Sequence, residues 1–384
     1  MAANKSLMVR RTIEILALAA FVMITSLLIL NYATPASPAE PFPDKEALTE
    51  ARHYLKLDDK TVQCQICPRK CVIEEGQRGT CRNRKNIEGK LYSLVYARPC
   101  ALNIDPIEKL PLFHVCPGGM RLNLATASCN LKCRNCQNWY LSQRAPEEVE
   151  SQSLSPEQVV GLALGSDLKF ISFTYTEPTV GYEYMYDIAK LAEERGIMTL
   201  LNTNGFINPK PLRELLQYVD AVNIDIKGFS EEFYATNCSG ELEPVLRSAM
   251  IVKEELKHLE IVNLIIPTLN DDISQIREMC LWIKENLGED VPLHFTRFFP
   301  AYKLTKLPPT PIDTLEKARE TAIGVGLKYV YIGNVPGHKA DNTYCPGCGE
   351  KLIGRLGLTL TENNVKGGKC IFCGLKIPGI WNQK

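Results

Sequence analysis

The sequence predicts an α/β fold in which parallel strands form a barrel or part of one. Seven short apolar runs, rich in β-branched or aromatic residues, alternate with amphipathic stretches. Repeated strand–helix units of this kind imply parallel strands joined by right-handed crossovers. In such barrels the chemistry lies in the loops that follow the strands.

Cysteine is the one unusual feature of the composition. The 384 residues suffice for one large domain with small additions, and a formal net charge of +0 gives no general attraction to nucleic acid. The chain has 15 cysteines, many of them grouped at metal-ligand spacing. Because disulfide scaffolds are normally much shorter than this chain, metal sites are expected rather than disulfides.

The first 50 residues lie outside the alternating pattern. Residues 1–12 form a basic segment, residues 13–30 are almost wholly apolar, and residues 31–50 form a Pro/Ala-rich linker. The apolar length is near the minimum for a membrane span, which predicts a single-pass anchor. A cleaved signal peptide is the alternative, since Ser37-Pro38-Ala39 fits a small-x-small cleavage site and Arg10-Arg11 fits a twin-arginine signal.

The strands and helices can be placed in order along the chain. Strands are expected at residues 122–127, 170–175, 198–202, 221–226, 261–267, 293–298 and 329–332. Helices are expected at residues 182–195, 210–218, 241–256, 273–285 and 315–325. A further helix should begin at Pro156, with Ser155 as its N-cap and Gln158 closing a capping box.

Three cysteines follow directly after the first predicted strand. They are Cys129, Cys133 and Cys136 in the stretch SCNLKCRNCQNW. A loop this tight can bring three thiolates around one centre, and thiolates select zinc or an iron–sulfur cluster. Three ligands leave one coordination position open, which distinguishes catalytic from structural sites.

This Cys-x3-Cys-x2-Cys loop resembles that of the radical S-adenosylmethionine (SAM) superfamily. The resemblance implies a partial (β/α)6-type radical SAM barrel in which the three cysteines hold a 4Fe–4S cluster. It also implies that SAM chelates the fourth iron and that a one-electron reductant supplies the electron. Reductive cleavage of SAM then gives a 5′-deoxyadenosyl radical that abstracts a hydrogen atom from a substrate.

The ends of later strands strengthen the resemblance. Glu177 precedes Pro178 at the position of the motif that binds the SAM amino group. Thr203-Asn204 ends the third strand, and Asp225 and Lys227 end the fourth, as in glycyl-radical-enzyme activases, although Asn202 replaces an aspartate of those activases. On strand six, His294 and Arg297 are expected to contribute to SAM or substrate contacts, with a packing role as the alternative.

Longer stretches resemble the AmmeMemoRadiSam system radical SAM enzymes. The matching stretches are residues 64–71, 75–81, 91–96, 105–109, 297–302, 331–337, 344–349 and 377–381. This resemblance implies Memo-type and Amme-type proteins as partners. The kinship with activases suggests a protein substrate, and the substrate itself stays open.

Two further cysteine sets flank the predicted barrel. Cys64, Cys67, Cys71 and Cys81 suit either a zinc ion or a second iron–sulfur cluster. Cys345, Cys348, Cys370 and Cys373 have the pattern of a zinc ribbon, and zinc is expected there. The remaining cysteines, among them Cys238, lack close partners in the sequence and are expected to be small buried residues.

Together these observations predict a radical SAM enzyme with two small metal-binding additions. The expected parts are residues 1–12, 13–30, 31–50, a four-cysteine region at 51–119, a core barrel at 120–338 and a zinc-ribbon-like domain at 339–384. The alternative is a membrane-anchored electron-transfer or structural metalloprotein without SAM chemistry. The basic residues before the span favour an external catalytic domain, but the need for SAM, electrons and reduced thiols favours the cytoplasmic side.

Overall fold

The computed structural model describes residues 48–382. The predicted basic segment, the apolar segment 13–30 and all but the last three residues of the linker lie outside the described residues. Within residues 48–382, no helix is both long and apolar enough to cross a membrane.

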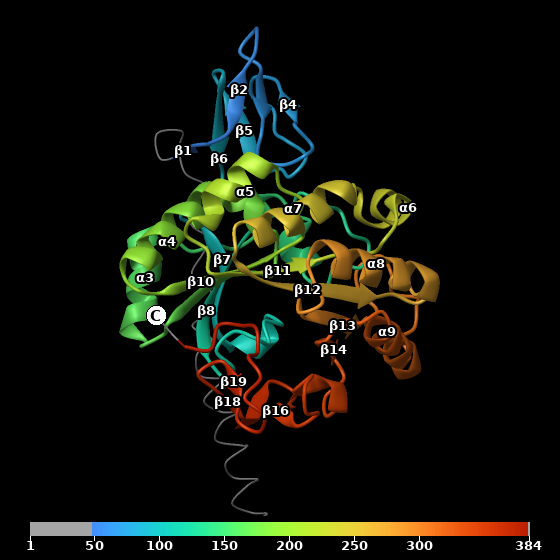
Figure 1. The fold of residues 1–384 in the computed structure, drawn as a ribbon. Helices are drawn as coiled ribbons and strands as arrows, with labels where there is room; N and C mark the ends of the chain where they lie inside the picture. The colour runs from blue at the N-terminus through green and yellow to red at the C-terminus, as the bar shows by residue number, and fades with distance from the viewer. Residues whose placement is uncertain (1–47, 383–384) are drawn as a thin grey trace, which may run out of the picture. The chain divides into compact units, whose positions relative to one another are not determined.

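An eight-stranded sheet forms the centre of the fold (Figure 1). Its strands are β7 (Pro99–Pro106), β8 (Met120–Thr126), β9 (Phe170–Phe173), β10 (Met198–Thr203), β11 (Ala221–Asp225), β12 (His258–Ile265), β13 (Leu293–Arg297) and β14 (Val330–Gly333). Strands β8 to β14 pair in chain order and all in parallel. The expected central parallel sheet is therefore confirmed, with seven strands where a (β/α)6 unit has six.

Strand β7 was not predicted from the sequence. It pairs antiparallel with β8 at the edge of the sheet, and its side chains are largely half-buried or exposed. Proline at both ends suits an edge strand, which needs no donor on its outer side. In the described chain β14 is the other edge, so the sheet stays open as a partial barrel.

The long helices lie along the outer face of the sheet (Figure 1). In chain order the helices are α2 (Trp139–Ser142), α3 (Pro156–Gly165), α4 (Tyr182–Glu194), α5 (Pro209–Leu216), α6 (Glu231–Phe233), α7 (Glu243–Glu254), α8 (Ile273–Asn286) and α9 (Ile312–Gly324). The predicted capping box of α3 is present, since the Gln158 amide donates to Ser155 Oγ and the Ser155 amide donates to Gln158 Oε1.

A loop closes the end of the sheet at which the strands begin. Ile107, Leu110, Leu112 and Val115 pack against the first residues of β9, β10 and β11, and all are fully buried. This apolar contact removes the floor of the barrel from water. The opposite end, where the loops leave the strands, is open to ligands.

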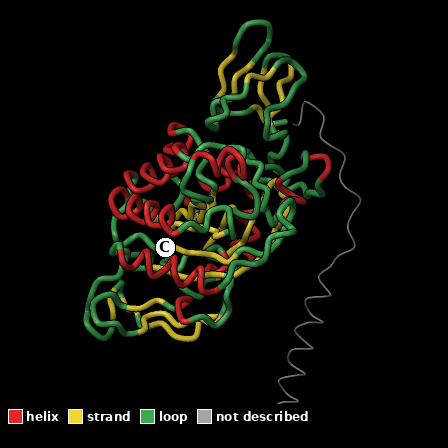
Figure 2. The backbone as a smooth tube through the Cα atoms, turned by 90° about the vertical axis from the view of Figure 1, so that its right-hand side faces the viewer, coloured by secondary structure: helices red, strands yellow, loops and turns green. Residues whose placement is uncertain are grey.

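Two small lobes made of strands adjoin the barrel (Figure 2). The N-terminal lobe contains β1 (Thr49–Glu50), β2 (Tyr54–Lys56), β3 (Val62–Cys64), β4 (Val72–Ile73), β5 (Arg84–Ile87) and β6 (Lys90–Ser93). The C-terminal lobe contains β15 (Thr343–Tyr344), β16 (Lys351–Leu356), β17 (Thr359–Asn363), β18 (Val365–Lys366) and β19 (Lys369–Cys370).

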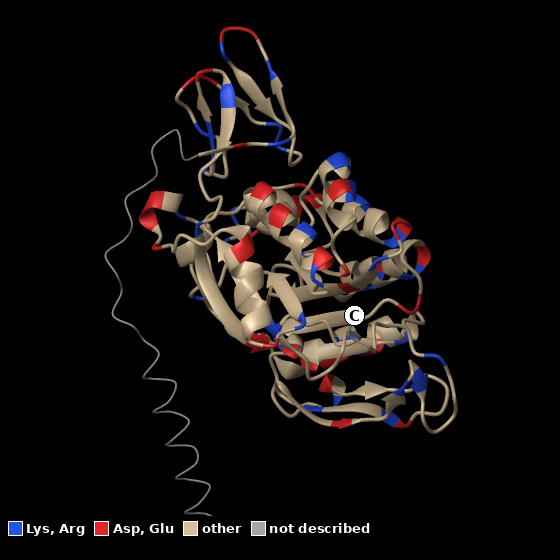
Figure 3. Ribbon diagram, turned by 90° about the vertical axis from the view of Figure 1, so that its left-hand side faces the viewer, with Lys and Arg blue, Asp and Glu red and all other residues tan. Residues whose placement is uncertain are grey.

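Buried polar contacts join each lobe to the barrel. In the N-terminal lobe, the Arg84 guanidinium lies 2.7 Å from the Glu183 carboxylate of α4, and both are almost fully buried. In the C-terminal lobe, Arg355 donates to the Phe113 carbonyl at the floor of the barrel. Figure 3 shows acidic and basic residues interspersed over the helices and both lobes, as the zero net charge leads one to expect.

Candidate active site

The cysteine loop, residues 128–139, leaves the carboxyl end of β8 and is held in place by backbone hydrogen bonds. The Lys132 and Arg134 amides donate to the carbonyls of Cys238 and Asn237, at 2.8 and 2.9 Å. Those acceptors end a π-helix, η5 (Tyr234–Cys238), a rare element that is frequent at functional sites. These contacts fix the position of the loop against η5.

A cavity of about 470 Å³ opens beside this loop. Its lining includes all three loop cysteines and five of the residues predicted to contact SAM, namely Glu177, Thr203, Asn204, Asp225 and Lys227. These residues come from the ends of β8, β9, β10 and β11. The fold thus brings to one place the groups that the sequence placed after successive strands.

The three loop thiols are free, partly buried and surrounded by polar groups. Cys129 Sγ accepts a hydrogen bond from the Leu131 amide at 3.4 Å, and Cys136 Sγ lies 3.2 Å from Ser142 Oγ. Burial raises the pKa of the Cys129 thiol well above its usual value. A metal or cluster bound here must displace those protons, since the thiolate is the ligand.

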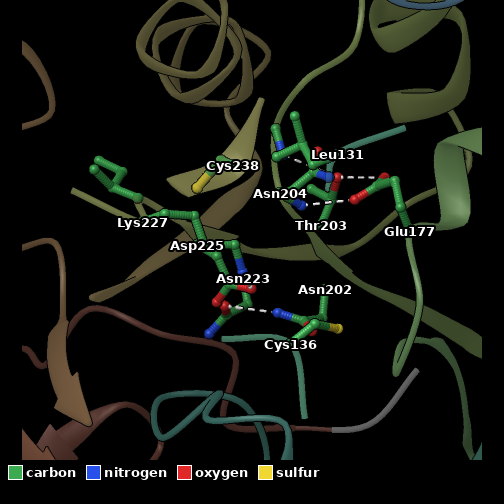
Figure 4. Close-up of polar contacts among 12 residues, drawn as sticks. Leu131, Cys136, Glu177, Asn202, Thr203, Asn204, Asn223, Asp225, Lys227 and Cys238 are labelled. Carbon is green, nitrogen blue, oxygen red and sulfur yellow. Dashed lines mark hydrogen bonds and ion pairs between the residues drawn. The ribbon is translucent and has the colours of Figure 1, made fainter. Parts of the chain in front are cut away.

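Cys238 completes the surroundings of the loop. Its thiol interacts with that of Cys133, and this interaction, together with burial, raises the pKa of the Cys133 thiol well above its usual value. Figure 4 shows Cys238 near Asp225 and Lys227. No sequence pattern indicated this proximity, because more than 100 positions separate the two cysteines.

Glu177 joins the ends of β9 and β10 through hydrogen bonds (Figure 4). Thr203 Oγ1 donates to its Oε1 at 2.8 Å, and the Asn204 amide donates to its Oε2 at 2.8 Å. Burial raises the pKa of this carboxyl group. Since Oε2 accepts one hydrogen bond from the described residues, it retains capacity to accept one from the amino group of a ligand.

Asp225 and Lys227 form an ion pair on the next strand end. Lys227 Nζ lies 2.6 Å from Asp225 Oδ2. Although burial opposes the ammonium charge, the Asp225 carboxylate raises the pKa of Lys227 above its usual value. Asn202, which stands where activases have an aspartate, donates instead to Asn223 Oδ1 at 3.0 Å.

His294 and Arg297, the two residues predicted on strand six, do not line the cavity. His294 lies near the start of β13, where its Nε2 is 2.6 Å from the buried Glu260 carboxylate. Arg297 Nε donates to the Thr310 carbonyl at 2.8 Å. Both side chains therefore have partners away from the cavity, as in the packing role considered for them.

Several cavity residues were missed by the sequence analysis. They are Lys109, Arg121, Tyr175, Thr296 and Asn334. Tyr175 has a left-handed backbone, φ 65°, which is uncommon for a residue other than glycine and is often found at functional sites. Alternation along the first strand, in which Arg121 and Asn123 share a face, is the one sequence signal for Arg121.

The cysteines of the C-terminal lobe have a different geometry. Cys345, Cys348, Cys370 and Cys373 have sulfur atoms that all lie within 4.8 Å of one another, with pairs at 3.6 and 3.8 Å. Tetrahedral zinc with Zn–S bonds of about 2.3 Å requires sulfurs about 3.8 Å apart. This cluster therefore has the size of a site for a single metal ion.

The N-terminal cysteines are neighbours but lie farther apart. Burial and the adjacent Cys64 thiol raise the pKa of Cys67, and burial raises the pKa of Cys64 to about 11. In the described chain, neither this set nor the loop set reaches the 4.8 Å spacing of the C-terminal cluster. A 4Fe–4S cluster, in which each thiolate binds a different iron, needs sulfurs roughly 6 Å apart.

Comparisons with known proteins agree with this site. The family model described as the radical SAM superfamily matches residues 124–283. An uncharacterized protein of Methanocaldococcus jannaschii is 49% identical over 332 residues, covering 86% of this chain and 99% of that protein. The pyruvate formate-lyase-activating enzyme of Clostridium pasteurianum is 27% identical over 177 residues, covering 43% of this chain and 70% of the enzyme.

Solved structures give a more distant likeness. The crystal structure of a radical SAM methyltransferase from Sphaerobacter thermophilus has a TM-score of 0.45 and 11% identity, covering 83% of this chain and 84% of that one.

Proposed function

Because this chain belongs to the radical SAM superfamily and is related to glycyl-radical-enzyme activases, we propose that Cys129, Cys133 and Cys136 hold a 4Fe–4S cluster with one iron left for SAM. When bound, the reduced cluster supplies the electron that cleaves SAM to methionine and a 5′-deoxyadenosyl radical, which abstracts a hydrogen atom from the substrate. The enzyme's own residues bind and orient the reactants.

One observation carries this proposal: the three free thiols line the same cavity as the polar ends of β9, β10 and β11. A carrier of electrons needs no such cavity. The donor set, three thiolates, also leaves one cluster iron without a protein ligand.

The other cavity residues have assignable tasks. Glu177 is proposed to accept a hydrogen bond from the SAM amino group through Oε2, with Thr203 and Asn204 fixing the carboxylate. The Asp225–Lys227 pair is proposed to contact SAM from the neighbouring strand end, with Lys227 available to an anionic group. These contacts hold SAM in one orientation before the electron arrives.

The test is anaerobic reconstitution of the full chain with iron and sulfide, followed by reduction and detection of 5′-deoxyadenosine. Wild type is expected to form it, and Cys133→Ala is expected to form none. Cys100→Ala is the matched control, because Cys100 is also buried in part but lies on β7 away from the cavity. A cluster that forms without any SAM cleavage would support the alternative, an electron-transfer or structural metalloprotein.

The metals of the two lobes are part of the proposal. Zinc is proposed for the C-terminal cluster on the basis of its sulfur distances. For Cys64, Cys67, Cys71 and Cys81 a second iron–sulfur cluster or a zinc ion is proposed, since four thiolates suit either. Iron and zinc contents of Cys67→Ala and Cys348→Ala, each compared with wild type, test the two assignments separately.

A protein substrate is proposed because relatives named as activating enzymes act in connection with other enzymes. Memo-type and Amme-type proteins are the partners to test first, by following hydrogen transfer from labelled candidates into 5′-deoxyadenosine. Residues 13–30 are proposed to anchor the enzyme, with the catalytic domain on the cytoplasmic side. Protease access in intact spheroplasts tests this topology.

A further inference from the structure

Arg121 is a buried cation at the far end of the cavity from the cysteines. It lies near the start of β8, whereas the cysteine loop leaves the other end of the same strand. Its side chain is only 1% exposed, yet it lines the cavity. The guanidinium thus faces the space in which a ligand would lie.

The hydrogen bonds of Arg121 leave part of the guanidinium unused. Its Nε donates to the Pro106 carbonyl at 3.3 Å, and Nη1 donates to Ser172 Oγ at 2.5 Å. Among the described residues, Nη2 has no acceptor and no carboxylate lies within 4.0 Å of the guanidinium. In contrast, the buried Arg84 and Arg355 each have a carboxylate within that distance, from Glu183 and Glu108.

The nearest acidic group is already occupied. Both oxygens of Asp105 lie 2.9 Å from Lys109 Nζ, and Oδ2 also accepts hydrogen bonds from Tyr175 and Asn123. The same contact balances the charge of Lys109. Asp105 pairs with Arg121 across the two strands and attracts it electrostatically, but its carboxylate contacts Lys109 and lies beyond 4.0 Å from the guanidinium.

A buried charge without a counter-ion in direct contact is costly, and a ligand anion that binds the free part of the guanidinium would offset this cost. Burial lowers the pKa of Arg121 to about 10, so the group remains charged at neutral pH. The planar guanidinium matches the geometry of carboxylate and phosphate groups. The adjoining walls offer Asn202 and Thr296 for polar contacts and Val262 and Leu264 for aliphatic ones.

We propose that Arg121 binds an anionic group of the substrate, a carboxylate or a phosphate, at the far end of the cavity. This inference rests on the proposed function, because it assigns the substrate of the same site. The anion lies away from the thiols, so it belongs to the substrate and not to the amino-acid part of SAM. Binding energy from this remote group would fix the carbon that loses hydrogen near the cysteine loop.

The test uses the reconstituted full chain with SAM present and small anions as probes. Calorimetry with malonate and with inorganic phosphate measures binding, and the neutral malonamide is the matched ligand control. We expect saturable binding of at least one anion, a loss of about tenfold or more in Arg121→Gln, and partial retention in Arg121→Lys. Arg247→Gln, an exposed arginine on α7, is the protein control and should bind as wild type does.

Three results would overturn the inference. The first is that wild type shows no saturable anion binding. The second is that Arg121→Gln binds the anion as tightly as wild type does. The third is that Arg121→Gln loses affinity for SAM by the same factor as it loses affinity for the anion. If Arg121→Gln does not fold, hydrogen exchange in wild type decides, because malonate but not malonamide should slow exchange in β8. Formation of 5′-deoxyadenosine by wild type reports on the proposed function independently, since anion binding requires no turnover.

Discussion

The cysteine loop and the C-terminal cluster both consist of cysteine thiols, but they differ in the number of thiols and in their surroundings. The loop has three thiols that line a cavity. The C-terminal cluster has four thiols within 4.8 Å, two of them exposed to solvent. Three thiols beside a cavity leave a coordination position for a ligand, as proposed for the loop, whereas four thiols can close a tetrahedral site, as proposed for the cluster.

The protein segments around the two sites also differ. Amides of the cysteine loop donate backbone hydrogen bonds to carbonyls of η5, and these bonds position the loop. The C-terminal lobe has a small apolar core that includes Leu352, Ile353 and Ile377, and two of its cysteines belong to that core. Metal loss should therefore cost activity at the first site and folding at the second.

The strongest effect should be on chemistry. Cys129→Ala should lower 5′-deoxyadenosine formation by about 1,000-fold or more, because a cluster ligand is lost. Its melting temperature without iron should stay within about 3 °C of wild type, since the loop is ordered by η5. Product analysis and calorimetry measure the two quantities, and a large melting shift would contradict the distinction between the two sites.

The second effect is on folding. Cys348→Ala should lose zinc and destabilise the C-terminal lobe by about 3 kcal/mol or more. Limited proteolysis should then cleave first within residues 343–370, while 5′-deoxyadenosine formed per cluster falls by no more than about threefold. Cys280→Ala, a buried cysteine outside both sites, is the control and should keep its zinc.

A third, smaller effect concerns the acid beside the cysteine loop. Glu177→Gln keeps the size of the side chain but removes the charge proposed to bind the SAM amino group. The dissociation constant of SAM should rise about tenfold, which is about 1.4 kcal/mol. Glu157→Gln, an exposed acid at the start of α3, should leave it unchanged. Equal affinity in Glu177→Gln and wild type would remove Glu177 from the site.

The fourth prediction concerns pH and the contact between the C-terminal lobe and the barrel. His114 Nδ1 donates to the Pro378 carbonyl at 2.7 Å and Nε2 accepts from the Tyr331 hydroxyl at 2.7 Å. Burial lowers the pKa of His114 to about 4. Since the unfolded chain takes up this proton near pH 6.5, stability present above pH 6.5 should be lost as the pH falls toward 4.

The expected loss is roughly 3 kcal/mol over that range. Protonation of Glu260 adds to this loss of stability at lower pH. Burial favours the neutral form of Glu260, but hydrogen bonds from His258 and His294 hold its pKa well below the usual value. Denaturant unfolding at about pH 7, 5.5 and 4.5 measures the slope. A flat profile, or one equally steep in His114→Gln, would show that His114 does not carry it.

The parts of the fold that follow local rules were predictable. The seven parallel strands and the capping box at Ser155 are confirmed, because apolar runs and capping residues act over a few positions. The three-cysteine loop was identified from its spacing directly after a strand, and Glu177 from the resemblance to the radical SAM superfamily. Strand β7 was missed because its prolines and half-exposed side chains do not resemble a buried strand.

The level of a side chain along the barrel axis was not predictable from the sequence. A side chain on a strand can face the interior at either end, and alternation reveals the face but not the level. For this reason His294, near the start of β13, was grouped with residues at the strand ends although it contacts Glu260. The approach of Cys238 to Cys133 depends on packing between distant segments, and so does the distance of more than 4.0 Å between Arg121 and any carboxylate of the described residues.

Arg69 has a practical consequence for anyone who seeks a minimal catalytic fragment. From the N-terminal lobe, its guanidinium donates to the carbonyls of Asn130 in the cysteine loop and Ser239 after η5. The family model matches residues 124–283. A chain trimmed to that range would lose the hydrogen bonds of Arg69 together with β7, β13 and β14. The smallest working enzyme must therefore begin well before the family boundary and end well after it.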